Sequence, residues 1–150
     1  MDAYVLLKLA HVVAAIVAVG TNLTYFYWLR QARAAGPHAH MALDGINRLD
    51  RALANPAYIA LPVTGIVMVV ISSLEFSTFW IAAAIVLFIV MAAYAGIAFT
   101  PSLRRQVELA RAEAPDAAAY RAASRRTTVT GVVTMVLVFA IVVLMVLKPG

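Results

Sequence analysis

Four long apolar runs dominate the sequence and restrict its fold more than any other feature. They extend over about 4–29, 55–74, 78–99 and 129–147 and contain few charged residues. About 20 apolar residues in a helix cross the hydrocarbon core of a bilayer, and a helix satisfies its own backbone hydrogen bonds there. The runs therefore predict an all-α integral membrane four-helix bundle, with residues 1–150 forming a single membrane domain.

Composition supports a membrane protein and excludes several other classes. The chain is 64% hydrophobic and 13% charged, whereas soluble domains carry about 45–50% apolar and about 25% charged residues. It has no cysteine, which excludes disulfides and thiolate-ligated metal sites. The first run follows Met1-Asp2-Ala3-Tyr4 without a basic region and is too long for a signal peptide, so we expect a retained helix.

The basic residues are divided unequally between the two sides of the predicted membrane. Segments 30–54 and 101–128 hold ten arginines, and only Lys8 and Lys148 remain for the opposite side. Positive charge marks cytoplasmic loops. We therefore predict that both arginine-rich segments are cytoplasmic, that both termini are non-cytoplasmic, and that the net charge of +5 serves orientation and does not bind nucleic acid.

Both arginine-rich segments also show helical patterns. Ile46, Leu49 and Leu53 recur at helical spacing, and 102–125 is rich in Ala, Arg and Glu with Pro115 dividing it. These patterns predict amphipathic loop helices that rest on the inner leaflet or cap the bundle. A solvated charged helix is the alternative. Asn55-Pro56 predicts the start of the second span, and Thr100-Pro101 the end of the third.

Polar residues within the spans form a stripe. Lys8, His11, Asn22 and Tyr25 share one face of the first helix, and Asn55 and Tyr58 share a face of the second. Lipid cannot satisfy such groups, so they should face the bundle interior. We expect Asn22 and Tyr25 to lie near the Asn55/Tyr58 end of the second helix. The stripe indicates either hydrogen bonds between helices or a ligand site.

His11 is the one histidine within a span, and Lys8 lies one turn before it. A neutral imidazole is a natural axial ligand of haem iron, and a lysine can pair with a porphyrin propionate. His11 and Lys8 are thus candidates for binding haem b, with His11 as the metal ligand. His38 and His40 stand two residues apart, would not share a helix face, and are expected to be solvated. The sequence contains no strong catalytic motif, so it does not decide whether the protein is an enzyme.

Three stretches resemble a known family. Leu7-Lys8-Leu9-Ala10-His11-Val12 with Gly20 is similar to the first helix of a family of bacterial predicted integral membrane proteins (domain of unknown function 2269). Leu49-Asp50-Arg51 with Pro56 and Thr64-Gly65 resembles its second helix, and Leu144-Met145-Val146-Leu147-Lys148-Pro149 its C-terminal signature. The first helix is also similar to copper-resistance protein D and to small membrane protoporphyrinogen oxidases, in which a histidine corresponding to His11 is associated with haem. The resemblance implies four helices in a bacterial inner membrane.

Three function classes remain open. The first is a non-catalytic structural or accessory membrane component, which needs no ligand beyond the lipid bilayer. The second is a haem- or porphyrin-binding membrane protein with a redox role that uses His11. The third is a small transporter or copper-handling protein. Each is compatible with a homo-oligomer or with membership of a larger membrane complex.

Overall fold

The computed structural model describes residues 2–112 and 116–149, and these form a bundle of long helices. The α-helices are α1 (Ala3–Ala34), α2 (Ala39–Leu49), α3 (Asn55–Ile71), α4 (Phe79–Tyr94), α5 (Thr100–Arg111) and α6 (Ala117–Leu147). A 3-10 turn, η1 (Gly36–His38), precedes α2, and two π turns, η2 (Asp50–Ala54) and η3 (Ala95–Phe99), follow α2 and α4.

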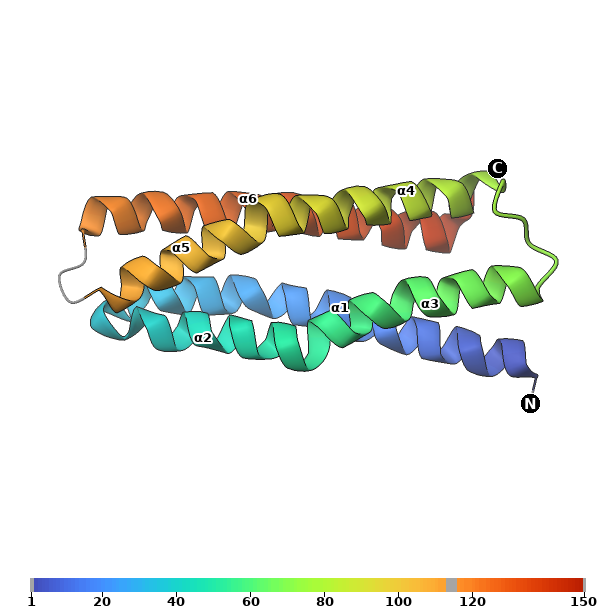
Figure 1. Cartoon of the computed structure of the whole chain (residues 1–150), viewed down its shortest axis with the longest axis horizontal. Coiled ribbons are helices and arrows are strands. Elements are labelled where there is room, and N and C mark those ends of the chain that lie inside the picture. The colour runs from blue at the N-terminus through green and yellow to red at the C-terminus, as the bar shows by residue number, and fades with distance from the viewer. Residues whose placement is uncertain (1, 113–115, 150) are drawn as a thin grey trace.

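The π turns join neighbouring helices into longer ones, so α2 continues into α3 and α4 into α5 (Figure 1). Four helical stretches are then long and apolar enough to cross a membrane: Ala3–Ala34, Ala39–Ile71, Phe79–Arg111 and Ala117–Leu147. This confirms the predicted all-α fold with four candidate spans. Each stretch is longer than its predicted span because the polar segments are themselves helical.

Two predicted helix boundaries are wrong. Asn55 does not cap a new helix, because its backbone N–H donates to the carbonyl of Asp50 within η2. The third helix does not stop at Thr100, whose N–H donates in the same way to Ala95 within η3. Each of these bonds reaches back five residues, and each directly precedes a proline. Proline lacks an N–H and clashes with the carbonyl four residues earlier, so the wider π turn lets the helix pass through it.

The amphipathic segments form α2 and α5 and bury their apolar faces. We call the half of the bundle that holds the arginine-rich segments 30–54 and 101–128 the polar half, and the half that holds both termini the apolar half. A hydrophobic cluster fills the polar half. It is made of Tyr25, Leu29, Ala32, Ala39, Ala42, Leu43, Ile46, Phe99, Leu103 and Val107. Of the predicted alternatives, capping the bundle agrees with this packing, since α2 contacts α1 and α5, and α5 contacts α6. Pro115 lies outside the described residues.

The apolar half consists of two helix pairs. Helix α1 packs against α3 and α4 packs against α6, and the pairs lie side by side in Figure 1. Small residues, Ala18 and Ala57 in the first pair and Ala84 in the second, are buried at these contacts. Such residues let backbones approach closely where lipid supplies no hydrophobic drive.

The two ends of the bundle differ in what they carry. The N-terminal end of α1, the C-terminal end of α6 and the turn between α3 and α4 lie at one end, and the turn between α1 and α2 lies at the other (Figure 1). Lys148 caps α6 in the left-handed conformation, and its ammonium lies 5.2 Å from the centroid of the Trp80 ring on α4. This contact ties α4 to α6 at the end that holds both termini.

Candidate functional site

Three side-chain hydrogen bonds connect α1 to the continuous helix formed by α2, η2 and α3. We call the six residues the polar row: His11, Asn22 and Tyr25 of α1, with Thr64, Tyr58 and Asp50 as their respective partners. The helices run antiparallel, so partners pair in reverse order along the chain. The row therefore extends from the apolar half, at His11, to the middle of the bundle, at Asp50.

The His11 side chain meets the Thr64 hydroxyl through its Nδ1 atom. His11 Nδ1 lies 2.8 Å from Thr64 Oγ1. The Thr64 hydroxyl is itself 2.7 Å from the carbonyl of Ala60, to which it donates as threonines within helices do. With this hydroxyl donating to Ala60, the threonine oxygen accepts from His11, and we infer a proton on Nδ1 and a lone pair on Nε2.

Gly65 makes room for the imidazole on the surface of α3. A Cβ atom at Gly65 would lie 3.3 Å from His11 Cε1, which is closer than nine in ten such contacts in proteins. The ring of His11 therefore rests directly against the backbone of α3. This packing and the bond to Thr64 together fix the histidine at the interface between the two helices.

Asn22 and Tyr58 form the second contact of the polar row. The amide of Asn22 donates to the Tyr58 hydroxyl. The Tyr58 ring also packs against Phe88 of α4, with ring centroids 6.4 Å apart and planes inclined by 52°. Tyr58 thus connects α3 both to α1 and to the second helix pair.

Tyr25 and Asp50 form the third contact, at the junction of the two halves. The Tyr25 hydroxyl donates to Asp50 Oδ1, and the Tyr25 ring stacks on Phe99 at a centroid distance of 6.2 Å. Tyr25 is buried, and Asp50 is the first residue of η2. We assigned Asp50 to a loop, so sequence reasoning missed it as a member of the site. The signal that could have found it is its place within Leu49-Asp50-Arg51, one of the stretches that carried the family resemblance.

The remaining predicted site residues lie elsewhere. The side chain of Asn55 is exposed, because the neighbouring Ala54 and then Ala57 occupy the face that contacts α1. Lys8 is also exposed, one turn from His11. The structure therefore brings together four of the six predicted stripe and cofactor residues, His11, Asn22, Tyr25 and Tyr58, and leaves Lys8 and Asn55 outside the row.

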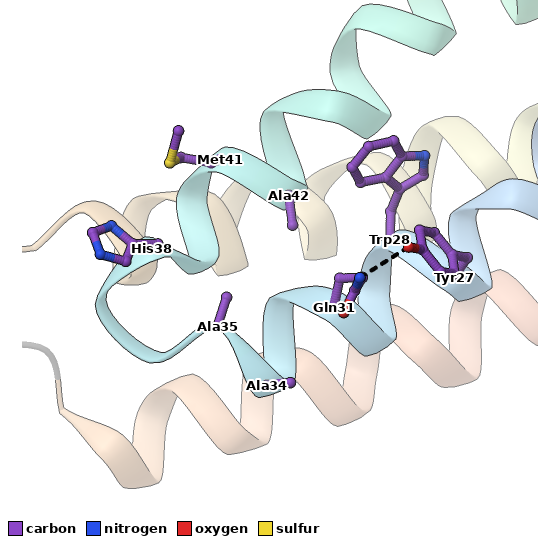
Figure 2. Close-up of a pocket in the computed structure, with 8 residues that line it drawn as sticks. All are labelled: Tyr27, Trp28, Gln31, Ala34, Ala35, His38, Met41 and Ala42. Carbon is purple, nitrogen blue, oxygen red and sulfur yellow. Dashed lines mark hydrogen bonds between the residues drawn. The ribbon is translucent and has the colours of Figure 1, made fainter.

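His38 and His40 lie at the opposite end of the bundle from His11. His38 helps to line an open pocket of about 430 Å³ between the end of α1 and the start of α2. Figure 2 shows His38 beside the turn, far from Trp28, with Gln31 donating to the Tyr27 hydroxyl at 2.9 Å. Within 2–112 and 116–149, no three His, Cys, Asp or Glu side chains gather in a group that could hold a metal ion.

A profile of the family described as "Predicted integral membrane protein (DUF2269)" matches residues 5–149. The chain belongs to this family. No curated protein and no solved structure matches it. The family resemblance predicted from the sequence is thereby confirmed for the DUF2269 chain, which is a multi-pass integral membrane protein.

Two of the three stretches that carried the resemblance meet in the DUF2269 fold. His11, from the first stretch, contacts Thr64 and Gly65 from the second. Asp50, also from the second, accepts from Tyr25 on the first helix. The C-terminal stretch ends α6, where the N–H of Lys148 donates to the carbonyl of Leu144 at 2.9 Å. Residues far apart in the sequence therefore act as partners at one helix interface.

Proposed function

We propose that this DUF2269 protein is a non-catalytic structural or accessory component of the membrane. The observation that supports the proposal is the polar row, in which the polar side chains of α1 bond to the neighbouring helical stretch of the same chain. Within lipid, such bonds are a main source of helix association. Each polar group of the row has a role in assembly that requires no substrate.

The outer faces of the helices support the same proposal. Large apolar side chains are exposed along one face of α3, at Ile59, Val63, Ile66 and Val70, spaced by three or four residues. A face of this kind suits contact with acyl chains, with a second copy of the chain, or with another membrane protein. We propose the bacterial inner membrane as the location, with the arginine-rich half on the cytoplasmic side.

One observation favours haem binding as a second candidate. Because His11 donates from Nδ1 to Thr64, the lone pair on Nε2 is the one that could bind iron, as in proteins where a hydrogen bond orients the ligating imidazole. Ala14 and Ala15 on the next turn are small. Lys8, although exposed, lies on the terminal side of His11, where propionates would reach the headgroups.

An absorption spectrum separates the two candidates. The wild type, His11→Ala and Thr64→Val would be expressed with haem supplied, purified in mild detergent, and measured near the Soret region together with their metal content. The accessory function predicts no Soret band in any of them and lower thermal stability in both variants. A Soret band in the wild type that His11→Ala abolishes would replace the accessory function with haem binding. The metal content of the same samples tests copper handling.

A further inference from the structure

An open hollow of about 940 Å³ lies in the polar half of the bundle. It is bounded by the ends of α1 and α5, the start of α2 and the first turns of α6. Its charged lining consists of Arg33, Arg121 and Arg125, with Tyr120, Ser124 and Thr128 contributing hydroxyl groups. A volume of this size accommodates a small ligand or a lipid headgroup.

Arg33 is held across the cavity by neutral partners. Its Nε lies 3.2 Å from Ser124 Oγ, and its Nη2 donates to Thr128 Oγ1. The Thr128 hydroxyl itself donates to the carbonyl of Ser124, at 2.9 Å, so its oxygen is available to accept from Arg33. Hydroxyl acceptors orient a guanidinium without cancelling its charge, so Arg33 retains a full positive charge in a fixed position.

The other two arginines lie on the same helix, one turn apart. Arg121 and Arg125 are exposed and line the cavity from α6. Among residues 2–112 and 116–149, the ion pairs join Arg105 with Glu108 and Arg111 with Asp44, and none involves a cavity arginine. The carboxylate of Asp116 interacts electrostatically with Arg121, but its hydrogen bonds are with the N–H groups of Ala118 and Ala119.

The rest of the cavity wall is apolar and leads towards the membrane. Small side chains, including Ala32 and Ala110, form much of the wall, and Tyr120 is anchored there by donating to the carbonyl of Ala32 at 3.4 Å. The lining on α6 ends at Val129, the first residue of the apolar run 129–147. Arg121 and Arg125 therefore lie within about two helical turns of the apolar run, so a lipid whose acyl chains lie along this run could bring its phosphate to them.

From this arrangement we propose that the cavity binds a phosphate-bearing anion through Arg33, Arg121 and Arg125. A guanidinium group binds two phosphate oxygens through parallel N–H donors, and three such groups line this one hollow without an acidic partner among its described lining residues. An anionic phospholipid would place its phosphate against the arginines and its acyl chains along α6 beyond Val129. A water-soluble phosphate would occupy the same arginines without the apolar contact. This site is independent of the polar row.

Native mass spectrometry of the full chain in detergent provides the test. The wild type would be mixed with phosphatidylglycerol, with phosphatidylcholine, or with inorganic phosphate, and the bound fraction measured for each. Arg125→Gln is the main variant, and Arg126→Gln is its matched control, since Arg126 is adjacent and exposed but does not line the cavity. Ala117→Trp adds a bulky side chain to the lining of the cavity without changing the charge, and circular dichroism verifies that each variant is helical.

The expected result is selective retention of phosphatidylglycerol by the wild type, weakened about tenfold by Arg125→Gln and by Ala117→Trp but not by Arg126→Gln. If inorganic phosphate binds with the same dependence on the variants and phosphatidylglycerol adds nothing, the anion site stands and its ligand is water-soluble. Equal effects of Arg125→Gln and Arg126→Gln on every ligand would overturn the proposal, because the attraction would then come from surface charge alone. Unchanged binding in Ala117→Trp would also overturn it.

Discussion

His11 on α1 lies 2.8 Å from the hydroxyl of Thr64 on α3, with its ring against Gly65. The two residues are 53 positions apart in the sequence and meet in the apolar half of the bundle. Their contact joins the first and second helical stretches. Lipid provides no hydrophobic driving force for helix association, so such a hydrogen bond can contribute to it. Several consequences of this contact and of its neighbours can be measured.

We expect His11 and Thr64 to be energetically coupled. In a double-mutant cycle of His11→Ala and Thr64→Val, the coupling free energy should be about 0.6–1.7 kcal/mol, as for other hydrogen bonds between membrane helices. Reversible unfolding in mixed micelles measures it. Thr24→Val is the matched control, since the exposed Thr24 donates only to the carbonyl of Thr21 in its own helix. Additive effects of His11→Ala and Thr64→Val would mean that the bond contributes nothing to stability.

Gly45 should tolerate a methyl group poorly. A Cβ atom there would lie 3.2 Å from Cε3 of Trp28, which packs α1 against α2. Gly45→Ala should therefore have a free energy of unfolding about 1–3 kcal/mol lower than that of Gly20→Ala, the usual effect of overpacking. Gly20→Ala is the comparison, because nothing lies within 4 Å of its Cβ position and alanine favours the helix. If both variants were stabilised, the contact with Trp28 would have no importance.

The start of α6 should respond to pH through Asp116. The N–H groups of Ala118 and Ala119 donate to its carboxylate at 2.8 and 3.1 Å, and they hold its pKa below the ordinary value of 3.8. The unfolded segment therefore binds the proton more readily than the folded one. The stabilisation is complete above pH 3.8 and is lost as the pH falls through the lower, folded pKa.

Amide exchange of Ala118 and Ala119 in micelles measures this effect. Their protection should fall with acidification in the wild type and should be low at every pH in Asp116→Ala. Asp116→Asn keeps an acceptor at the cap but cannot titrate, so its protection should not change over the same range. A parallel decline in the wild type and in Asp116→Asn would assign the pH dependence to another group.

The topology can be tested by single-cysteine labelling, since the chain has no cysteine of its own. Ser77→Cys lies in the turn between α3 and α4, and His38→Cys in the turn between α1 and α2, at opposite ends of the bundle. Both positions are exposed. The distribution of arginines predicts that a membrane-impermeant maleimide labels Ser77→Cys in intact cells and labels His38→Cys only after permeabilisation. The reverse pattern would invert the proposed orientation.

The sequence predicted the helices and named four of the six residues of the polar row, all except Thr64 and Asp50, for a clear physical reason. Hydrophobic runs identify spans directly, and helical spacing placed Asn22 and Tyr25 on one face of α1. Tyr58 was found in the same way. The partner of Tyr25 could not be found, because Asn55-Pro56 is typical of a helix start and so separated Asp50 from the helix to which it belongs. Asn55 was predicted to face the interior because it is polar and lies three residues before Tyr58, whereas the small Ala54 and Ala57 are the residues buried there.

The two π turns restrict the chain in a further way. A π turn contains one residue more than an α-helix needs for the same rise, so η2 behaves as a single-residue insertion within an otherwise regular helix. If the same residues were wound as a regular α-helix, α2 would be rotated by about 100° relative to α3. Asp50 and Tyr58 could then no longer face α1 together. The extra residue held in η2 therefore determines which faces of α2 and α3 meet α1.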